Sequence, residues 1–494
     1  MTTDPQTPAK QAPSFRKGVL FSGSGTAVSI IFLFLETAIA ARLLSQADFG
    51  VYVILIWVVN FLVVIVDFGF KTGVTHFIAS GDHERQIRVA NTALLFRLLL
   101  VGLITLLIWW RRDVLLLFDS TEAMLQYAYT VPLLLLFTSL DELFLSVLQG
   151  LHAYRQMAQA QLLRSVLRLS LTAFFLIVLQ LGIIGLIYST LISFTLSVIY
   201  QYVVLPIPRR LVFQRPLLSE MLRFGFPLHL NRVLWFTVQR LNLLVLALLG
   251  GPASVAIYNV AARIPEALQR LSQSYTTVYF PTMTAMLTQG KRDEASHMLN
   301  QSLRVISFVT ALMAIVSTVF SSQIITIFVS SKYAESSWVF ALLMVAFHMS
   351  FLVSMMGYTL TAAGYPSRSL AQNTLRTVVN VGGVFLLTPV LGVAGPAYAA
   401  LLAEYTANPF TVWLLRRSDI AASIRAYGIQ TLLLLLGVGA YWWLQPHNLI
   451  ISALIVVLFV VLNVVLSTIS RDDLQSLLPR RLTKRFNVAK QPSS

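Results

Sequence analysis

The chain has 494 residues, of which 57% are hydrophobic and 11% are charged. These proportions are typical of a polytopic membrane protein and exclude the soluble globular and disordered classes. The absence of cysteine excludes disulfides and thiolate chemistry. The formal net charge of +16 does not by itself indicate nucleic-acid binding, because orientation in a membrane explains most of it.

Apolar runs of about 20 residues, the length that crosses a bilayer as a helix, recur along nearly the whole chain. Hydropathy and helix breakers predict about fourteen such spans. They are expected near 17–43, 47–79, 86–110, 123–151, 155–181, 183–206, 219–249, 253–287, 295–330, 336–363, 368–390, 393–415, 424–444 and 447–469. The predicted fold class is therefore an all-α polytopic membrane protein.

Basic residues gather at alternate junctions between these spans. One side carries Arg16, Lys17, Arg85, Arg88, Arg155, Arg209, Arg210, Arg215, Lys291, Arg292, Arg368, Arg416, Arg417, Arg425 and the tail from Arg471. The other side carries only Arg42, Arg111, Arg112 and Lys332. This asymmetry predicts a multi-pass protein of the cell (cytoplasmic or inner) membrane with both termini in the cytoplasm.

The two ends of the chain differ from its middle. Residues 1–14 are polar and are expected to form a disordered cytoplasmic leader. Residues 471–494 combine leucines with arginines and lysines, which predicts a basic amphipathic segment on the anionic inner leaflet rather than a nucleic-acid-binding tail.

The chain resembles itself at an offset of about 206–211 residues. Leu181, Gly182, Gly185 and Tyr188 return as Leu391, Gly392, Gly395 and Tyr398, and Tyr154 returns as Tyr365. The repeat predicts two six-helix bundles of the same orientation, 15–210 and 211–418, followed by two additional helices at 419–470. Two bundles related by a parallel repeat are the architecture of many transporters, in which the substrate site lies at the interface between the bundles. Chance similarity among low-complexity helices is the alternative.

Arginines lie well inside the apolar stretches, where each one facing lipid would cost about 2.5–3.5 kcal/mol. Together they would cost more than the stability of a typical fold, so they must be paired or line a wet, protein-walled cavity. A cavity with several fixed cations suits an anion. The predicted substrate-binding residues are Arg164, Arg168, Arg232, Arg240, Arg263 and Arg270.

Four of these arginines flank the turn at Pro252. Arg240 and Arg263 lie about twelve residues from it on either side, and Arg232 and Arg270 lie about nineteen residues from it. Helix geometry therefore predicts two cationic tiers, about 17 Å and 28 Å along the helices from the turn. Like charges at one level repel unless an anion, or an acid from elsewhere, lies between them.

Internal pairing is the alternative explanation for these charges. Glu266 lies within one turn of Arg263 and Arg270, and Asp67 has Lys71 four residues on, so both acids have a cation on their own helix. Arginines nearer the cytoplasmic end are expected to snorkel to the interface. These are Arg97, Arg223, Arg304 and Arg376. Most of the deeper arginines do not recur at their repeat partners, so the repeat itself does not require them.

Carboxylates inside a membrane are candidates for proton or cation coupling. Those within the spans are Glu36, Asp67, Asp141, Glu142, Glu266 and Glu404. Glu36 and Glu404 have no obvious partner on their own helix, and together with Asp67 they are the predicted coupling residues for H⁺ or Na⁺. The sequence shows no metal-ligand or nucleophile pattern, so we expect no catalytic residue, no metal and no cofactor.

Three motifs carry a resemblance to a known family. Ala41-Arg42-Leu43-Leu44 with Phe49-Gly50-Val51-Tyr52 opens the second span, Asp67-Phe68-Gly69 lies within it, and Leu-Gly-x-x-Gly-x-x-Tyr occurs at 181 and 391. Together they resemble the bacterial polysaccharide transporters, the oligosaccharide-lipid flippases of the multidrug/oligosaccharidyl-lipid/polysaccharide exporter superfamily. The resemblance covers nearly the whole chain. His76 departs from it, because relatives often carry an arginine there.

The resemblance implies two bundles that open alternately to the two sides of the membrane. The implied substrate is an undecaprenyl-pyrophosphate-linked repeat unit, flipped to the outer leaflet for O-antigen or exopolysaccharide synthesis. A cation-lined cavity suits its pyrophosphate. The expected partners are this lipid-linked oligosaccharide, membrane lipids, a coupling cation, and a polysaccharide polymerase and chain-length proteins, but not nucleic acid.

Two other functions compete with the flippase. A multidrug–cation antiporter of the same superfamily would favour an acidic cavity, which the excess of embedded arginine over acid opposes. A membrane enzyme, such as a polysaccharide polymerase or ligase, usually needs a long outer loop, and the outer loops here are short. We therefore predict a flippase and not an enzyme.

Overall fold

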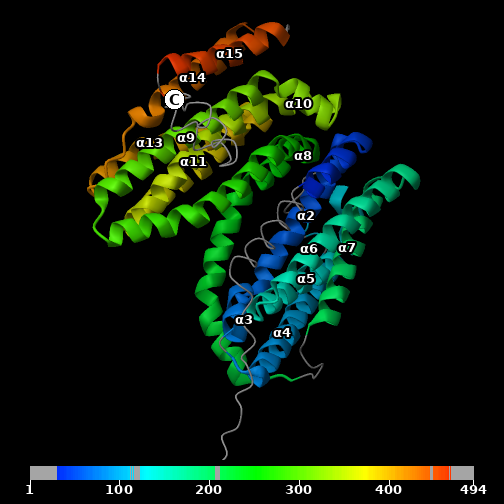
Figure 1. The fold of residues 1–494 in the computed structure, drawn as a ribbon. Coiled ribbons are helices and arrows are strands. Elements are labelled where there is room, and N and C mark those ends of the chain that lie inside the picture. The colour runs from blue at the N-terminus through cyan, green and yellow to red at the C-terminus, as the bar shows by residue number, and fades with distance from the viewer. Residues whose placement is uncertain are drawn as a thin grey trace, which may run out of the picture. The chain divides into compact units, whose positions relative to one another are not determined.

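The computed structural model describes residues 31–79, 81–111, 113, 115, 123–205, 212–444, 449–466 and 468. Every regular element in these ranges is helical (Figure 1). The predicted all-α polytopic fold is therefore confirmed. The leader 1–14, the start of the first span and the tail 471–494 lie outside the described residues.

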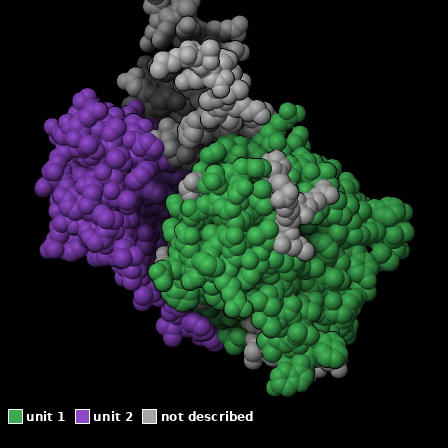
Figure 2. All heavy atoms as spheres, turned by 90° about the horizontal axis from the view of Figure 1, so that it is seen from below, with its two compact units in different colours: residues 1–256 green, residues 257–494 purple. Residues whose placement is uncertain are grey.

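The chain divides into two compact units, residues 1–256 and 257–494, which Figure 2 colours separately. In the first unit, residues 31–43 are helical. The elements that follow are α2 (Gln46–Asp67), α3 (Phe70–Ala79), α4 (His83–Trp110), the 3₁₀ helix η2 (Ala123–Thr130), α5 (Val131–Gly150), α6 (Tyr154–Ala173), the π-helical turn η3 (Phe174–Val178) and α7 (Gly182–Val204). Helix α8 (Arg215–Thr288) then runs from the first unit into the second.

The second unit continues from α8 with helices of similar length. They are α9 (Arg292–Val319), α10 (Ser321–Phe328), η4 (Ser331–Tyr333), α11 (Ser336–Ala362), α12 (Pro366–Leu391), η5 (Gly392–Ala394), α13 (Gly395–Arg416), α14 (Arg425–Leu444) and α15 (Leu449–Val465). Where the structure describes them, most predicted spans coincide with one helix, or with two in succession such as α2 and α3 or α9 and α10, whereas the spans 219–249 and 253–287 are the two arms of α8.

Ten helical stretches of the described chain are long and apolar enough to cross a membrane. Helix α4 shows a lipid-facing pattern, because most of its apolar stretch is not buried inside the protein. Its exposed apolar side chains are Leu98, Leu99, Leu103, Leu106, Leu107, Trp109 and Trp110. Tryptophans at the end of such a stripe are typical of the membrane–water interface. The protein is therefore a multi-pass membrane protein.

Local sequence explains where several helices begin. The Ser45 hydroxyl accepts a hydrogen bond from the backbone N–H of Asp48 at 3.0 Å, and α2 starts between them. Asp82 caps α4 in the same way, accepting from the backbone N–H of Arg85 at 2.7 Å. Pro366 opens α12, where a missing N–H costs nothing because the first-turn donors have no helical partner.

A backbone break separates α2 from α3 within one predicted span. Phe68 and Gly69 both have positive φ, 47° and 76°. A Cβ at Gly69 would overlap the backbone of Gly225 on α8, so only glycine allows the two backbones to approach this closely. The Asp67-Phe68-Gly69 motif thus marks the place where α2 ends, α3 begins and α8 crosses.

Helix α8 is broken at Gly251, whose backbone has φ 70° and ψ −176°. The arm before this break packs within the first unit. Trp57 Nε1 donates to the carbonyl of Arg240 at 3.0 Å, and directly after the break the backbone of Pro252 lies against Gly50. The packing boundary at residue 256 thus lies beyond the end of the first repeat, and the bundles 15–210 and 211–418 stay a prediction.

The two copies of the Leu-Gly-x-x-Gly motif adopt related turns. Gly182 and Gly392 have φ of 61° and 57°, and each lies in the connection between two helices that pack on one another, α6 with α7 and α12 with α13. These turns agree with the predicted repeat, in which α12 would be the equivalent of α6.

Candidate functional site

The most deeply buried charge cluster of the first unit surrounds Asp67, at the end of α2. Arg97 Nη2 on α4 donates to Asp67 Oδ1 at 2.7 Å, and Arg232 Nη1 on α8 lies 2.6 Å from Oδ2. The carboxylate also accepts from the backbone N–H of Lys71 at 3.1 Å. Only 1% of the Asp67 and Arg97 side chains is exposed. Two arginines therefore hold one buried carboxylate.

The same cluster reaches the surface of the unit at Glu142 on α5. Arg232 Nη2 donates to both Glu142 oxygens, at 2.9 and 2.7 Å, and Lys71 Nζ lies 3.6 Å from Oε1. The exposed fractions of Arg232, Glu142 and Lys71 are 20%, 25% and 53%. We call Asp67, Lys71, Arg97, Glu142 and Arg232 the Arg232 network. Its buried end at Asp67 is the closed end, and its partly exposed end at Lys71 is the open end.

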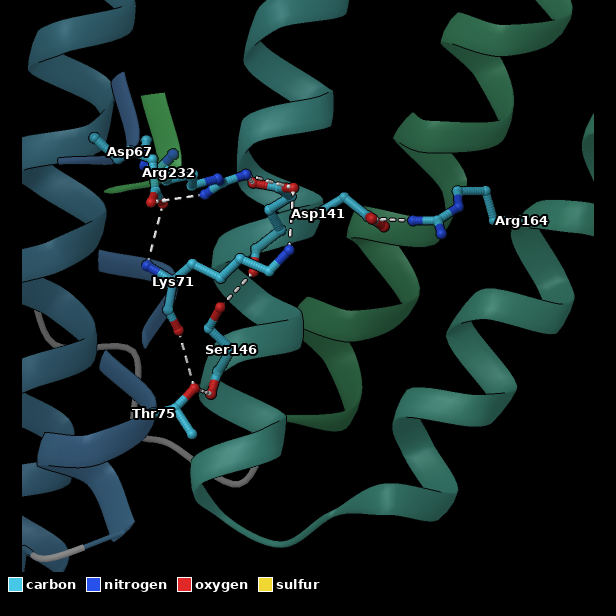
Figure 3. Close-up of polar contacts among 9 residues, drawn as sticks. Asp67, Lys71, Thr75, Asp141, Ser146, Arg164 and Arg232 are labelled. Carbon is cyan, nitrogen blue, oxygen red and sulfur yellow. Dashed lines mark hydrogen bonds and ion pairs between the residues drawn. The ribbon is translucent and has the colours of Figure 1, made fainter. Parts of the chain in front are cut away.

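Asp141, the neighbour of Glu142 on α5, belongs to a different cluster. It forms an ion pair with Arg164 on α6 and accepts hydrogen bonds from Ser197 Oγ at 2.7 Å and Gln201 Nε2 at 2.6 Å on α7. Successive helical residues point about 100° apart, so one dipeptide serves two networks. Figure 3 shows Asp141 directed toward Arg164 and away from Asp67 and Arg232.

A third cluster joins Glu36, Arg168 and Tyr52. Arg168 Nε donates to Glu36 Oε1 at 2.8 Å, and its Nη2 donates to the Tyr52 hydroxyl at 2.8 Å. That hydroxyl is also hydrogen-bonded to Thr190 on α7, at 2.8 Å. The cluster thereby ties together helix 31–43, α2, α6 and α7, and it brings the predicted Glu36 and Arg168 into direct contact.

The second unit contains a comparable cluster. Arg376 on α12 forms an ion pair with Glu404 on α13, and its Nη2 donates to Ser350 Oγ on α11 at 3.0 Å. Helix α12 would be the equivalent of α6 in the predicted repeat, and each of the two helices carries an arginine that is paired with an acid on a neighbouring helix. Both arginines lie on the middle helix of three, but the acid comes from the preceding helix in one unit and from the following helix in the other.

Two interpretations from the sequence need correction. Arg97 and Arg376 do not snorkel, since each is paired with a buried carboxylate on another helix. The Lys71 ammonium does not pair with Asp67, because its side chain extends to Glu142 while only its backbone N–H contacts Asp67. The i, i+4 spacing correctly predicted a contact between Lys71 and Asp67, but the backbone N–H of Lys71 makes this contact and not its side chain.

The remaining predicted residues lie on the two arms of α8. Arg240 and Arg263 are partly buried and Arg270 is exposed. Arg240 belongs to the first unit, and Arg263 and Arg270 belong to the second. The two cationic tiers would need both units, so they stay a prediction.

Aromatic stacking accompanies the crossing of α2, α3 and α8. The rings of Phe68 and His229 stack with centroids 5.0 Å apart, and those of His76 and Phe224 with centroids 4.7 Å apart. His76, where the chain departs from the family resemblance, thus packs against α8. These contacts fix the α8 arm beside Asp67 and so position Arg232.

Sequence reasoning noted Asp141 and Glu142 but assigned neither a role. The available signal was their adjacency in the middle of a span, which places two carboxylates on two faces of one helix. Arg97 was missed because its distance from the helix end suggested an interfacial location. Within the described residues, no group of three or more potential metal-binding His, Asp or Glu side chains occurs.

The chain matches known proteins by family profile and by fold. The family profile "Polysaccharide biosynthesis protein" matches residues 39–338. The structure is similar to the lipid II flippase MurJ in an inward closed conformation, with 15% identity, a TM-score of 0.69, and coverage of 90% of this chain and 97% of that one. No match was found among curated proteins.

Two further solved structures share the fold. The inward-facing conformation of a multidrug resistance MATE family transporter of the MOP superfamily has 19% identity, a TM-score of 0.67, and coverage of 81% of this chain and 98% of that one. A MOP superfamily transporter from Pyrococcus furiosus has 18% identity, a TM-score of 0.56, and coverage of 84% and 99%. At these identities the likeness establishes the fold alone.

Proposed function

This chain belongs to the polysaccharide biosynthesis protein family, and we propose that it flips an undecaprenyl-pyrophosphate-linked oligosaccharide across the cytoplasmic membrane. The repeat unit would move from the inner to the outer leaflet by alternating access, for O-antigen or exopolysaccharide synthesis. The proposed orientation has both termini in the cytoplasm. A polysaccharide polymerase and chain-length proteins are the proposed partners that use the product.

The observation that carries this proposal is the open end of the Arg232 network. Arg232 and Lys71 are cations of partial exposure inside a membrane-spanning unit. A guanidinium and an ammonium side by side suit a diphosphate, since charge-assisted hydrogen bonds to phosphate oxygens are among the strongest that proteins make. A cationic drug would instead be repelled there, which disfavours the multidrug antiporter.

The other predicted arginines have different proposed roles. Arg164 and Arg168 are held by the buried acids Asp141 and Glu36, so we propose that they stay in these ion pairs rather than exchange partners. Arg240, Arg263 and Arg270 are proposed substrate contacts from the two arms of α8.

The proposed coupling groups are all ion-paired. Glu36 is paired with Arg168, Asp67 with Arg97 and Arg232, and Glu404 with Arg376. A carboxylate held by arginine can take up a proton or a cation only after that pair opens. We therefore propose that coupling acts through opening of such a pair, as the bundles 15–210 and 211–418 move.

The test is complementation of a strain that lacks this gene, with Lys71→Gln and Arg232→Gln at matched membrane abundance. We expect each to reduce surface polysaccharide by about tenfold, because one charge-assisted contact is worth roughly 1.5 kcal/mol. Arg85→Gln is the control, since the Arg85–Glu220 ion pair is exposed and lies outside the network. Full polysaccharide from both variants would contradict the proposal, as would drug resistance without polysaccharide from the wild type.

A further inference from the structure

The charges of the Arg232 network do not balance. Three cations, Arg97, Arg232 and Lys71, face two carboxylates, Asp67 and Glu142, which leaves one positive charge in excess. An uncompensated charge of this kind is costly in a membrane-embedded site. The excess lies at the open end, because Asp67 is already held by two arginines at the closed end.

The two carboxylates, Asp67 and Glu142, differ in how easily each can separate from its cations. Asp67 is fully buried, and withdrawing it would leave the guanidinium of Arg97 buried without its acid. Glu142 is a quarter exposed, and its partners Arg232 and Lys71 are themselves partly exposed. Glu142 can therefore leave its partners at far lower cost than Asp67 can.

Six other helices carry the charged and polar groups that contact Glu142 or its neighbours Asp67 and Asp141. Lys71 lies on α3 and Arg232 on α8, where His229 lies one turn earlier against Phe68. Asp67 on α2 and Arg97 on α4 reach Glu142 only through Arg232. From α6 and α7, Arg164, Ser197 and Gln201 face Asp141 instead. Among the described residues, the direct charged partners of Glu142 are thus two cations.

We propose that Glu142 is an internal competitor of the substrate's anionic head. In the empty site its carboxylate occupies Arg232 and Lys71, and a diphosphate displaces it from both. This inference rests on the proposed function and adds to it the residue that regulates binding. The alternative is that Glu142 forms a purely structural ion pair. Asp141 is the example of such a pair in this unit, because it is buried among its partners, whereas Glu142 is a quarter exposed.

The competition predicts how Glu142 affects anion binding. The diphosphate must break the contacts of the Glu142 carboxylate with Arg232 and Lys71 before it can bind to these two cations. Replacing Glu142 by glutamine removes the competitor permanently. The variant therefore binds the anion more tightly.

Titration calorimetry on the purified full chain tests this, with symmetrical dimethyl diphosphate as the probe. This diester keeps both negative charges throughout the neutral range, so the probe itself does not titrate. We expect Glu142→Gln to bind the probe about tenfold more tightly than the wild type, a difference of about 1.4 kcal/mol. The control is Glu220→Gln. Glu220 lies on α8 and forms an exposed ion pair with Arg85, so this variant should behave as wild type.

Several outcomes overturn the inference. Glu142→Gln that binds the probe no more tightly than wild type contradicts it. If that variant does not fold, Glu142→Ala decides, since binding no tighter than wild type contradicts the inference equally. That result together with normal complementation leaves the proposed function standing. Failure of every form to bind the diester, together with failed complementation, overturns both.

Discussion

Asp141 and Glu142 are consecutive residues on α5, yet they take part in two different kinds of polar network. Asp141 is buried, and one arginine, one serine and one glutamine donate to it at short distances. Glu142 is partly exposed and shares two cations with a second carboxylate, leaving positive charge in excess. Adjacent carboxylates on one membrane helix can therefore differ in whether their partners balance their charge, and we propose that this difference separates a structural charge from a functional one.

The largest effect is expected at the closed end of the Arg232 network. Asp67→Asn leaves Arg97 buried without a carboxylate, which costs about 3–5 kcal/mol. We expect low membrane abundance and a strongly lowered unfolding temperature in detergent. Asp113→Asn, at an exposed pair with Arg111, provides the control and should change neither. Wild-type stability of Asp67→Asn would mean that Asp67 does not hold Arg97 in place.

An intermediate effect is expected for Asp141→Asn. Arg164 is a quarter exposed and can reach a more polar environment, so the loss should be about 1–3 kcal/mol. Thermal unfolding measures it, and the affinity for the dimethyl diphosphate probe should not change. Glu142→Gln should show the reverse pattern, with altered affinity and little loss of stability. If both variants change affinity alike, the distinction between the two networks fails.

The smallest effect on stability is expected at Lys71. Its ion pair with Glu142 is 3.6 Å long and half exposed, so Lys71→Gln should cost less than about 1 kcal/mol. Binding of the same probe should nevertheless weaken, because one of the two proposed phosphate contacts is gone. Calorimetry and unfolding of the same preparation separate the two quantities. Unchanged affinity would remove Lys71 from the site and leave Arg232 alone.

The fold was largely predictable from the sequence. Hydropathy located the helices, and the breaks lie at glycines that the motifs had already marked, such as Gly69 and Gly182, since only glycine adopts positive φ without strain. The family resemblance, carried by short motifs at helix ends, agrees with the family profile over residues 39–338.

The pairing of the charges was not predictable. Arg168 pairs with Glu36, which lies 132 residues away in the sequence, and Arg232 pairs with Glu142, which lies 90 residues away. Such partners are decided by which helix faces pack together, whereas a sequence shows only neighbours on one helix, as with Lys71 and Asp67. The sequence therefore identified the anomalous arginines but could not tell those with complete partners from those without.

The most direct test of the central claim is transport by the purified protein in vesicles. The two candidate cargoes are a fluorescent undecaprenyl-diphosphate oligosaccharide and a lipophilic cation. We expect the diphosphate-linked lipid to change leaflet, more slowly in Lys71→Gln and Arg232→Gln than in Arg85→Gln, and the cation not to move. Transport of the cation, with no flipping of the diphosphate-linked lipid, would contradict an anion-binding site at the open end of the Arg232 network.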